Sequence, residues 1–327
     1  MHSVGTPLLW IGFLVFVLFM LAVDLFVAHR EDHEVRFREA ALWSVIWIAL
    51  SLAFNGLVWH WFGKQHALEF LTAYLVEKTL SVDNLFVFLV LFSSFAVPPK
   101  LVHRVLFWGV LGALVLRGIF IGLGTALVQR FDWVMHIFGG ILVVTGAKLL
   151  FQAAAEPEPE KNPIFRLFRR FVPSVSAYHG RSFLIRVEGK LHATPLFLVL
   201  VAIEATDVVF AVDSIPAVFG ISQDPFIVYT SNIFAILGLR SLFLLLAGVI
   251  SKLRYLKTGL AFVLVFIGAK MVAGYWYHVP IGASLAVIAG ILGTAIAASL
   301  LNPLPEEEAA ALTGAGGAAS KEVPEEP

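Results

Sequence analysis

Apolar segments, each about the length of a membrane-spanning helix, follow one another along most of the chain. A hydrocarbon core about 30 Å thick needs about 20 apolar residues in a helix. Such segments lie near residues 7–27, 40–61, 68–97, 101–126, 131–151, 194–220, 226–250, 258–278 and 280–301. The pattern predicts an all-α, polytopic membrane protein of about nine transmembrane helices. The first segment lacks a basic start and a cleavage site, so we expect it to remain as an uncleaved span.

Polar stretches between the apolar segments divide the chain into units. The central loop places Arg166, Arg169 and Arg170 among phenylalanines, which fits either an amphipathic helix on the membrane surface or an ordinary basic loop. The last residues are rich in Ala, Gly, Glu and Pro, a composition typical of disorder. The predicted units are an N-terminal two-helix segment (1–67), a three-helix unit (68–151), a cytoplasmic loop (152–193), a second three-helix unit (194–278), a final helix (279–301) and a disordered cytoplasmic tail (302–327).

Composition supports the membrane class and narrows the chemistry. The chain is 59% hydrophobic and only 14% charged, with a mean hydropathy of +0.87, far from the average soluble protein. It contains no cysteine. Disulfides, thiolate metal sites and dithiol redox chemistry within this chain are therefore excluded, and carboxylate, amide, hydroxyl and imidazole groups remain as ligands.

Basic residues between the apolar segments set the expected orientation. Nearly all loop lysines and arginines fall on one side of the predicted membrane, whereas the opposite side carries only Lys64 and Arg130. Because cytoplasmic loops carry the excess of Lys and Arg, the N-terminus is predicted outside and the C-terminus in the cytoplasm.

Two acidic segments interrupt this apolar pattern. One is Glu-Lys-Thr-Leu-Ser-Val-Asp-Asn at 77–84, and the other runs from Glu204 through Asp207 and Asp213 to Pro216. A charged side chain at mid-bilayer costs about 2.5–3.5 kcal/mol on insertion scales, and such residues commonly mark ion or proton pathways. We therefore expect these carboxylates to handle a cation or protons.

The two acidic segments belong to a predicted repeat. Glu77 and Asp83 have the same spacing as Asp207 and Asp213. Further along, Leu-Val-Leu-Arg at 114–117 resembles Leu-Gly-Leu-Arg at 237–240, and Gly-Ala-Lys occurs at both 146–148 and 268–270. The two units would cross the membrane in opposite directions, as in transporters with inverted repeats and broken helices. Pro216 predicts a kink beside Asp213 that would free the Val212 carbonyl as a ligand.

A balance of charges within the spans favours a bound cation. Arg117 and Arg240 could each clamp a carboxylate structurally or take part in gating, yet the acids (Asp24, Glu77, Asp83, Glu204, Asp207, Asp213) still outnumber the bases. Oxygen ligands alone suit Mg²⁺, Ca²⁺ or Mn²⁺ better than Zn²⁺. The candidate metal ligands are Glu77, Asp83, Asn84, Glu204, Asp207 and Asp213. The supporting ion-pair or gating residues are Arg117, Arg240, Lys78, Lys148, Lys270 and Asn232.

These motifs resemble those of the TerC family, and more closely its Alx-like subgroup. The resemblance is carried by residues 77–84, 210–217, 230–240 and 268–270, and extends over about residues 5–300. It implies a bacterial inner-membrane protein that exports Mn²⁺. Because the sequence has no nucleotide-binding motif, a secondary transporter is predicted, with proton exchange as the candidate driving force.

Other functions were weighed against transport. Asp83 and Asp213 could imitate an intramembrane aspartyl protease, but no Gly-x-Gly-Asp motif is present, so no enzyme activity is expected. The alternatives are a membrane-protein assembly or insertion factor, or a tellurite-resistance or redox-modulator role secondary to metal homeostasis. The expected partners are the lipid bilayer and the divalent ion. No nucleic acid and no cofactor besides the transported ion are expected, and the oligomeric state is left open.

Overall fold

The structure is a computed structural model of the full chain. It describes residues 3–28, 37–131, 133–151, 172–175, 177–187, 189–247, 254–274, 276–277 and 279–302. The predictions for the basic segment around residues 165–171 and for the tail from residue 303 onward lie outside this described part.

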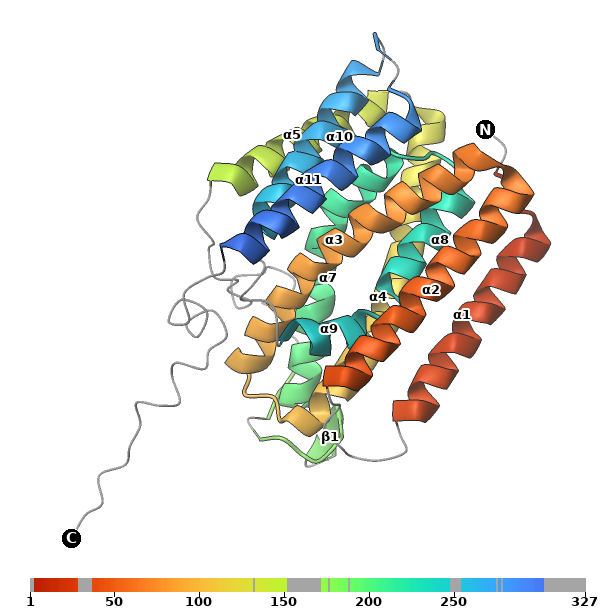
Figure 1. The fold of residues 1–327 in the computed structure, drawn as a ribbon. Helices are drawn as coiled ribbons and strands as arrows, with labels where there is room; N and C mark the ends of the chain where they lie inside the picture. The colour runs from red at the N-terminus through yellow and green to blue at the C-terminus, as the bar shows by residue number, and fades with distance from the viewer. Residues whose placement is uncertain are drawn as a thin grey trace.

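Almost all described residues belong to a bundle of α-helices (Figure 1). Its connections are short, except between α5 and α7, where a β-hairpin occurs. The helices are α1 (Pro7–Ala28), α2 (Phe37–Phe62), α3 (Lys64–Ser94), α4 (Pro99–Arg130), α5 (Trp133–Phe151), α7 (Pro195–Phe219), α8 (Pro225–Ile236), α9 (Leu239–Ala247), α10 (Leu256–Ala273) and α11 (Ile281–Leu301). The strands are β1 (Leu184–Val187) and β2 (Lys190–Ala193).

Among the described residues, six helices are long and apolar enough to cross a membrane, namely α2, α4, α5, α7, α10 and α11. Two shorter apolar stretches, Pro7–Val23 and Pro225–Ile236, lie in α1 and α8. The 31-residue α3 carries several charged side chains along its length. The all-α membrane fold is therefore confirmed, while the number of nine spans stays a prediction.

The helices form a central group with one flank on each side. Figure 1 shows α1 and α2 on one flank and α5, α10 and α11 on the other, with α3, α4, α7 and α8 between them. On the second flank, a Cβ at Gly146 would lie 2.7 Å from the Ala261 carbonyl, and one at Gly268 would lie 2.6 Å from the Gly139 carbonyl. Glycine at these positions lets the backbones of α5 and α10 meet directly.

The relative directions of the matched helices agree with an inverted arrangement. Glu69, near the start of α3, contacts Ser222, which follows the end of α7, so these two helices run antiparallel. The pairs Gly139–Gly268 and Gly146–Ala261 show that α5 and α10 are antiparallel as well. This is the orientation that an inverted repeat requires, and the repeat itself stays a prediction.

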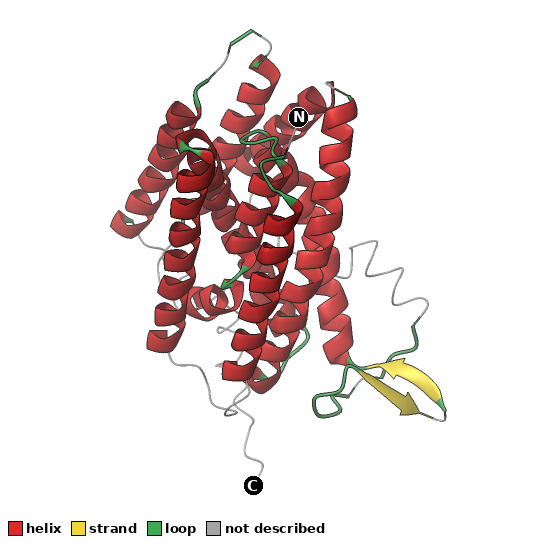
Figure 2. Ribbon diagram, turned by 90° about the vertical axis from the view of Figure 1, so that its right-hand side faces the viewer, coloured by secondary structure: helices red, strands yellow, loops and turns green. Residues whose placement is uncertain are grey.

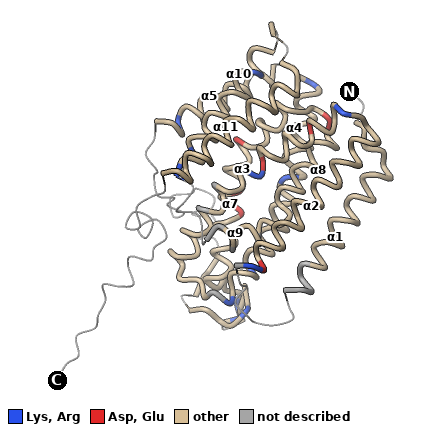
Figure 3. Tube along the Cα trace, in the orientation of Figure 1, with Lys and Arg blue, Asp and Glu red and all other residues tan. Residues whose placement is uncertain are grey.

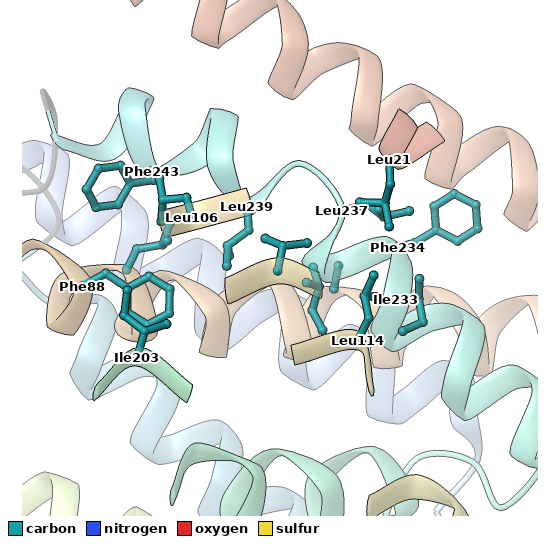
Figure 4. Packing of buried hydrophobic residues seen from close by; sticks show 14 of the residues in the cluster. Leu21, Phe88, Leu106, Leu114, Ile203, Ile233, Phe234, Leu237, Leu239 and Phe243 are labelled. Carbon is teal, nitrogen blue, oxygen red and sulfur yellow. The ribbon is translucent and has the colours of Figure 1, made fainter. Parts of the chain in front are cut away.

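The prediction of one helix over 226–250 is wrong, because the chain is interrupted between α8 and α9. Gly238 has φ +80°, a conformation that L side chains rarely adopt. A Cβ there would also lie 2.6 Å from the Trp47 ring. Figure 4 shows Leu237 and Leu239 on either side of the interruption, packed within the hydrophobic core. The broken helix therefore lies in the bundle interior.

The helix carrying the second acidic segment is not broken at Pro216. α7 continues through this proline and ends at Phe219. Because Pro216 lies in the last turn, its missing N–H removes a single hydrogen bond close to the helix end. α7 is therefore continuous beside Asp213, and the kink predicted at Pro216 stays a prediction.

A small hairpin within the predicted loop 152–193 was not expected. β1 and β2 pair in antiparallel register, with Leu184 opposite Ala193, and project from one end of the bundle (Figure 2). Tyr178, in the segment that precedes β1, donates a 2.7 Å hydrogen bond to the Phe95 carbonyl. The hairpin thus lies beside the end of α3.

Candidate functional site

Charged positions are sparse along the bundle, and several of them lie in its interior (Figure 3). Among the described residues, the most enclosed are Glu77 on α3, with a side chain 0% exposed, and Arg117 on α4, which is 1% exposed. These residues lie where α3, α4, α7 and α8 meet. The interior of the bundle therefore holds candidate functional groups.

Arg117 joins three helices to α4. Its Nη1 donates to Glu77 Oε1 and, at 3.2 Å, to Asn232 Oδ1 on α8. Its Nη2 donates to Asp207 Oδ1 on α7 at 3.4 Å. Arg117 therefore pairs with carboxylates, Asn232 forms an interhelical hydrogen bond with it, and a role of these residues in gating stays a prediction.

Carboxylates outnumber the guanidinium at this centre. Glu204 lies one turn before Asp207 on the same face of α7, close enough for the two acids to interact. Its carboxyl group packs against Gly112 of α4, in the space that a Cβ would need. Among the described residues, one carboxylate oxygen on each of Glu77, Glu204 and Asp207 is buried without a hydrogen-bond donor. Two acids thus pair with one arginine, a third lies one turn from Asp207, and all three retain acceptor sites.

Asp213 lies in a separate pocket between α3, α5, α7 and α10. Thr145 on α5 donates a 2.8 Å hydrogen bond to Asp213 Oδ1, and Lys148 is near enough to attract the carboxylate. The pocket has a volume of about 60 Å³, room for a few water molecules or a partly hydrated ion. Its lining residues are Leu80, Asn84, Leu149, Phe210, Asp213, Ser214, Leu260 and Leu264.

The unbroken geometry of α7 explains why the acids occupy two places. Asp207 and Asp213 are six residues apart, which is about 9 Å along a helix and about 120° around it. Asp207 therefore faces Arg117 on α4, and Asp213 faces Thr145 on α5. Within the described part of the chain, no group of three or more Asp, Glu, His or Cys side chains is arranged to hold a metal ion. The predicted ligands are thus divided between an Arg117 centre and an Asp213 pocket.

The remaining predicted residues whose side chains are described lie in different parts of the bundle. Asn84 lines the Asp213 pocket. Lys78 donates to the Ala235 carbonyl at the end of α8 at 3.1 Å. Lys270 donates to the Gly220 carbonyl at 3.4 Å. The side chains of Asp24, Asp83 and Arg240 lie outside the described part of the structure.

Sequence reasoning missed two hydroxyl residues beside Asp213, one bonded to its carboxylate and one in the pocket lining. Thr145 directly precedes Gly-Ala-Lys at 146–148, and Ser214 directly follows Asp213. Ser214 Oγ is buried without a partner among the described residues. The available signal was a hydroxyl side chain directly beside a motif residue in an apolar helix.

A second polar group missed by the sequence reasoning joins the start of α3 to the α7–α8 connection. Glu69 accepts hydrogen bonds from Ser222 Oγ at 2.7 Å and from Gln65 Nε2 at 3.2 Å, and lies 3.2 Å from His66 Nδ1. Asp224, two residues after Ser222, caps α8 by accepting from the Phe226 and Ile227 backbone N–H groups. These contacts fix the end of the bundle at which α3 starts.

The helical bundle, its membrane-length apolar helices and its buried charges define a multi-pass, all-α integral membrane protein. Residues 62–305 match the family model described as "Integral membrane protein TerC family". The chain therefore belongs to the TerC family.

Relatives agree with this assignment over nearly the whole chain. An uncharacterized membrane protein, STKORF319, of Myxococcus xanthus is 52% identical over 91% of this chain and 94% of its own length. The putative membrane-bound redox modulator Alx of Escherichia coli K12 is 49% identical over 89% of this chain and 94% of its own. An uncharacterized membrane protein of Rickettsia felis is 38% identical over 89% of this chain and 97% of its own. No solved structure matches the chain.

Proposed function

We propose that this protein is a secondary transporter that exports a divalent metal cation from the cytoplasm in exchange for protons, with Mn²⁺ as the first candidate for the cation. The bacterial relatives and the basic loops support a place in the inner membrane with the N-terminus outside. The observation that carries the proposal is the Asp213 pocket, a largely apolar cavity whose lining also includes a carboxylate, an amide and a hydroxyl group.

The ligands available in this pocket favour a hard cation. Asp213 supplies a carboxylate, Asn84 an amide and Ser214 a hydroxyl whose oxygen has no partner among the described residues. Oxygen donors of this kind suit Mg²⁺, Ca²⁺ and Mn²⁺. The narrower choice of Mn²⁺ comes from the family resemblance, not from the donor set.

Export of a divalent cation needs a driving force. Moving two positive charges out against a potential of about 100 mV, inside negative, costs about 4.6 kcal/mol. The Arg117 centre suits a proton carrier, because Glu77 and Asp207 share one guanidinium, Glu204 lies one turn from Asp207, and each of these acids keeps an unpartnered oxygen within the described part of the bundle. Protons taken up by these acids would balance the charge as the metal leaves.

The redox function in the name of the Escherichia coli relative fits this proposal indirectly. The present chain contains no cysteine, so we attribute a redox or tellurite phenotype to altered metal balance. A role as a membrane-protein assembly factor is the second candidate, and it would not require metal binding. Binding of Mn²⁺ to the purified protein separates these functions.

Transport in proteoliposomes tests the proposal directly. Purified protein is reconstituted, Mn²⁺ uptake or release is followed with an entrapped fluorescent chelator, and a pH gradient is imposed in either direction. We expect Mn²⁺ flux that follows the pH gradient, and loss of flux in Asp213→Asn. Asp224→Asn serves as a control, because this acid caps α8 outside both polar centres and asparagine retains the cap.

Two results would count against the proposal. Flux that ignores the imposed pH gradient would exclude proton exchange. Equal Mn²⁺ flux in wild type, Asp213→Asn and protein-free vesicles would exclude transport through the pocket.

A further inference from the structure

The β1–β2 hairpin is tied to the start of α7. Thr194, the residue before this helix, places its hydroxyl oxygen 2.8 and 3.0 Å from the Ser182 and Phe183 carbonyls and donates its backbone N–H to the Phe183 carbonyl at 3.0 Å. At the end of β2, Ala193 is 0% exposed and exchanges backbone hydrogen bonds with the segment 173–175. The hairpin therefore keeps a fixed direction relative to the bundle.

The hairpin begins beside the side of α4 that faces lipid. Exposed apolar side chains follow one another along this helix at helical spacing, namely Trp108, Val115, Ile119, Leu123 and Leu127. The first of them, Trp108, meets the ring of Phe183 edge to face, with ring centroids 6.4 Å apart. One turn closer to the start of α4, the Arg104 guanidinium lies 5.2 Å from the centre of the same ring. Because tryptophan and basic residues mark the ends of a membrane span, Phe183 lies at the level of the lipid headgroups.

From this level the hairpin extends away from the helices. Figure 2 shows both strands at one end of the bundle, pointing sideways past the helices. The space beside a membrane-spanning bundle at headgroup level is occupied by the surface of the bilayer. Residues 181–193 carry three basic side chains and one acid, the sign of charge that an anionic lipid surface attracts.

The register of the hairpin places apolar and basic side chains on one face. Opposite residues of an antiparallel pair share a face, so Leu184, Arg186 and Leu191 lie together, with Val187 and Lys190 on the other face. Leu184 and Leu191 are 45% and 55% exposed, and Arg186 between them is exposed as well. Among the described side chains, neither Arg186 nor Lys190 forms an ion pair. Two leucines and a free cation thus share one exposed face.

We propose that the face formed by Leu184, Arg186 and Leu191 docks on the anionic lipid surface of the leaflet at this end of the bundle. The two leucines enter the boundary between headgroups and acyl chains, and Arg186 pairs with lipid phosphates. Lys190, next to Leu191 on a long side chain, reaches the same phosphates and adds a second cation. This surface is separate from the Arg117 centre and the Asp213 pocket and goes beyond the proposed metal export.

Because the chain contains no cysteine, a single fluorescent probe can be attached to the hairpin of the full-length protein. The probe is placed on Leu191→Cys, and the protein is reconstituted in nanodiscs whose lipids carry a nitroxide quencher near the headgroup. Nanodiscs of phosphatidylcholine alone are compared with nanodiscs that also contain phosphatidylglycerol. We expect stronger quenching in the anionic nanodiscs, and a loss of this difference at high salt. Arg186→Gln, and separately Lys190→Gln, should each lower the ratio of docked to free hairpin by about fivefold.

Two variants serve as matched controls. A probe on Val187→Cys, on the opposite face of the hairpin, should be quenched less than the probe on Leu191→Cys. Lys64→Gln, at an exposed lysine at the other end of the bundle, should leave the quenching of the Leu191→Cys probe unchanged.

Three results would overturn the proposal. The first is equal quenching of the Leu191→Cys probe in neutral and anionic nanodiscs, and the second is quenching that Arg186→Gln and Lys190→Gln both leave unchanged. The third is efficient disulfide linkage between two Leu191→Cys chains in anionic proteoliposomes, which would assign this face to a second copy of the chain. None of these outcomes depends on Mn²⁺ export.

Discussion

Replacing Arg117 by methionine should destabilise the protein more than any other single change at the polar centres. Methionine fills a similar volume and removes the positive charge together with the hydrogen bonds to Glu77, Asp207 and Asn232. Two buried carboxylates would then face each other without a counter-charge. The protein would have to take up a proton or open this part of the bundle.

The magnitude follows from the burial of the pair. Arg117 is 1% exposed and Glu77 is 0% exposed, and removing one partner of such a buried ion pair costs about 3–5 kcal/mol. For a chain of this size that corresponds to a fall in Tm of about 10 °C. The double variant Arg117→Met, Glu77→Gln should be more stable than Arg117→Met alone, because the second substitution removes one uncompensated charge.

The assay is thermal unfolding in detergent, followed by tryptophan fluorescence, for wild type, both single variants and the double variant. Arg130→Met is the matched control, since this exposed arginine ends the same helix and should change the Tm little. A Tm for Arg117→Met equal to that of Arg130→Met would refute the buried clamp. Strict additivity in the double variant would show that Arg117 and Glu77 do not interact.

Three further predictions concern the packing and the ends of the bundle. Gly146→Ala places a Cβ 2.7 Å from the Ala261 carbonyl and should cost about 1–3 kcal/mol, whereas Gly140→Ala meets nothing within 4 Å, so equal Tm values would contradict the α5–α10 contact. Asp224→Ala removes the cap of α8 and should lower the free energy of unfolding by about 1–2 kcal/mol, as measured by urea or thermal unfolding. Unchanged stability would exclude a stabilising cap. Burial raises the pKa of Tyr178 above its ordinary 10.0, so the contribution of its hydroxyl to the free energy of unfolding is complete below pH 10 and is lost as the pH rises above 10. Tyr178→Phe should remove this alkaline loss of stability, and the same dependence of Tm on alkaline pH in both proteins would contradict the role of the buried hydroxyl.

Much of the fold follows from the hydrophobic pattern. Apolar length predicts the helical bundle. The pairing of Arg117 with a carboxylate also follows, because a charge in a bilayer needs a partner. These properties depend on local spacing and on general costs, so a single sequence can reveal them.

The position of the helix break could not be inferred in the same way. Pro216 is the stronger breaker by propensity, yet it falls in the last turn of α7, whereas Gly238 interrupts α8–α9 beside Trp47. That outcome depends on a tertiary contact with α2. The continuity of α7 explains why the acids form two centres, because Asp207 and Asp213 then point toward different neighbouring helices.

Direct metal binding to the purified protein tests the central claim, that the buried oxygen groups recognise a divalent cation. Calorimetric titration with Mn²⁺, Mg²⁺, Ca²⁺ and Zn²⁺ is performed on wild type and on Asp213→Asn. We expect saturable Mn²⁺ binding by wild type and at least tenfold weaker binding by Asp213→Asn, a loss of about 1.4 kcal/mol or more. No Mn²⁺ binding by folded wild type, or equal affinity in Asp213→Asn, would contradict it.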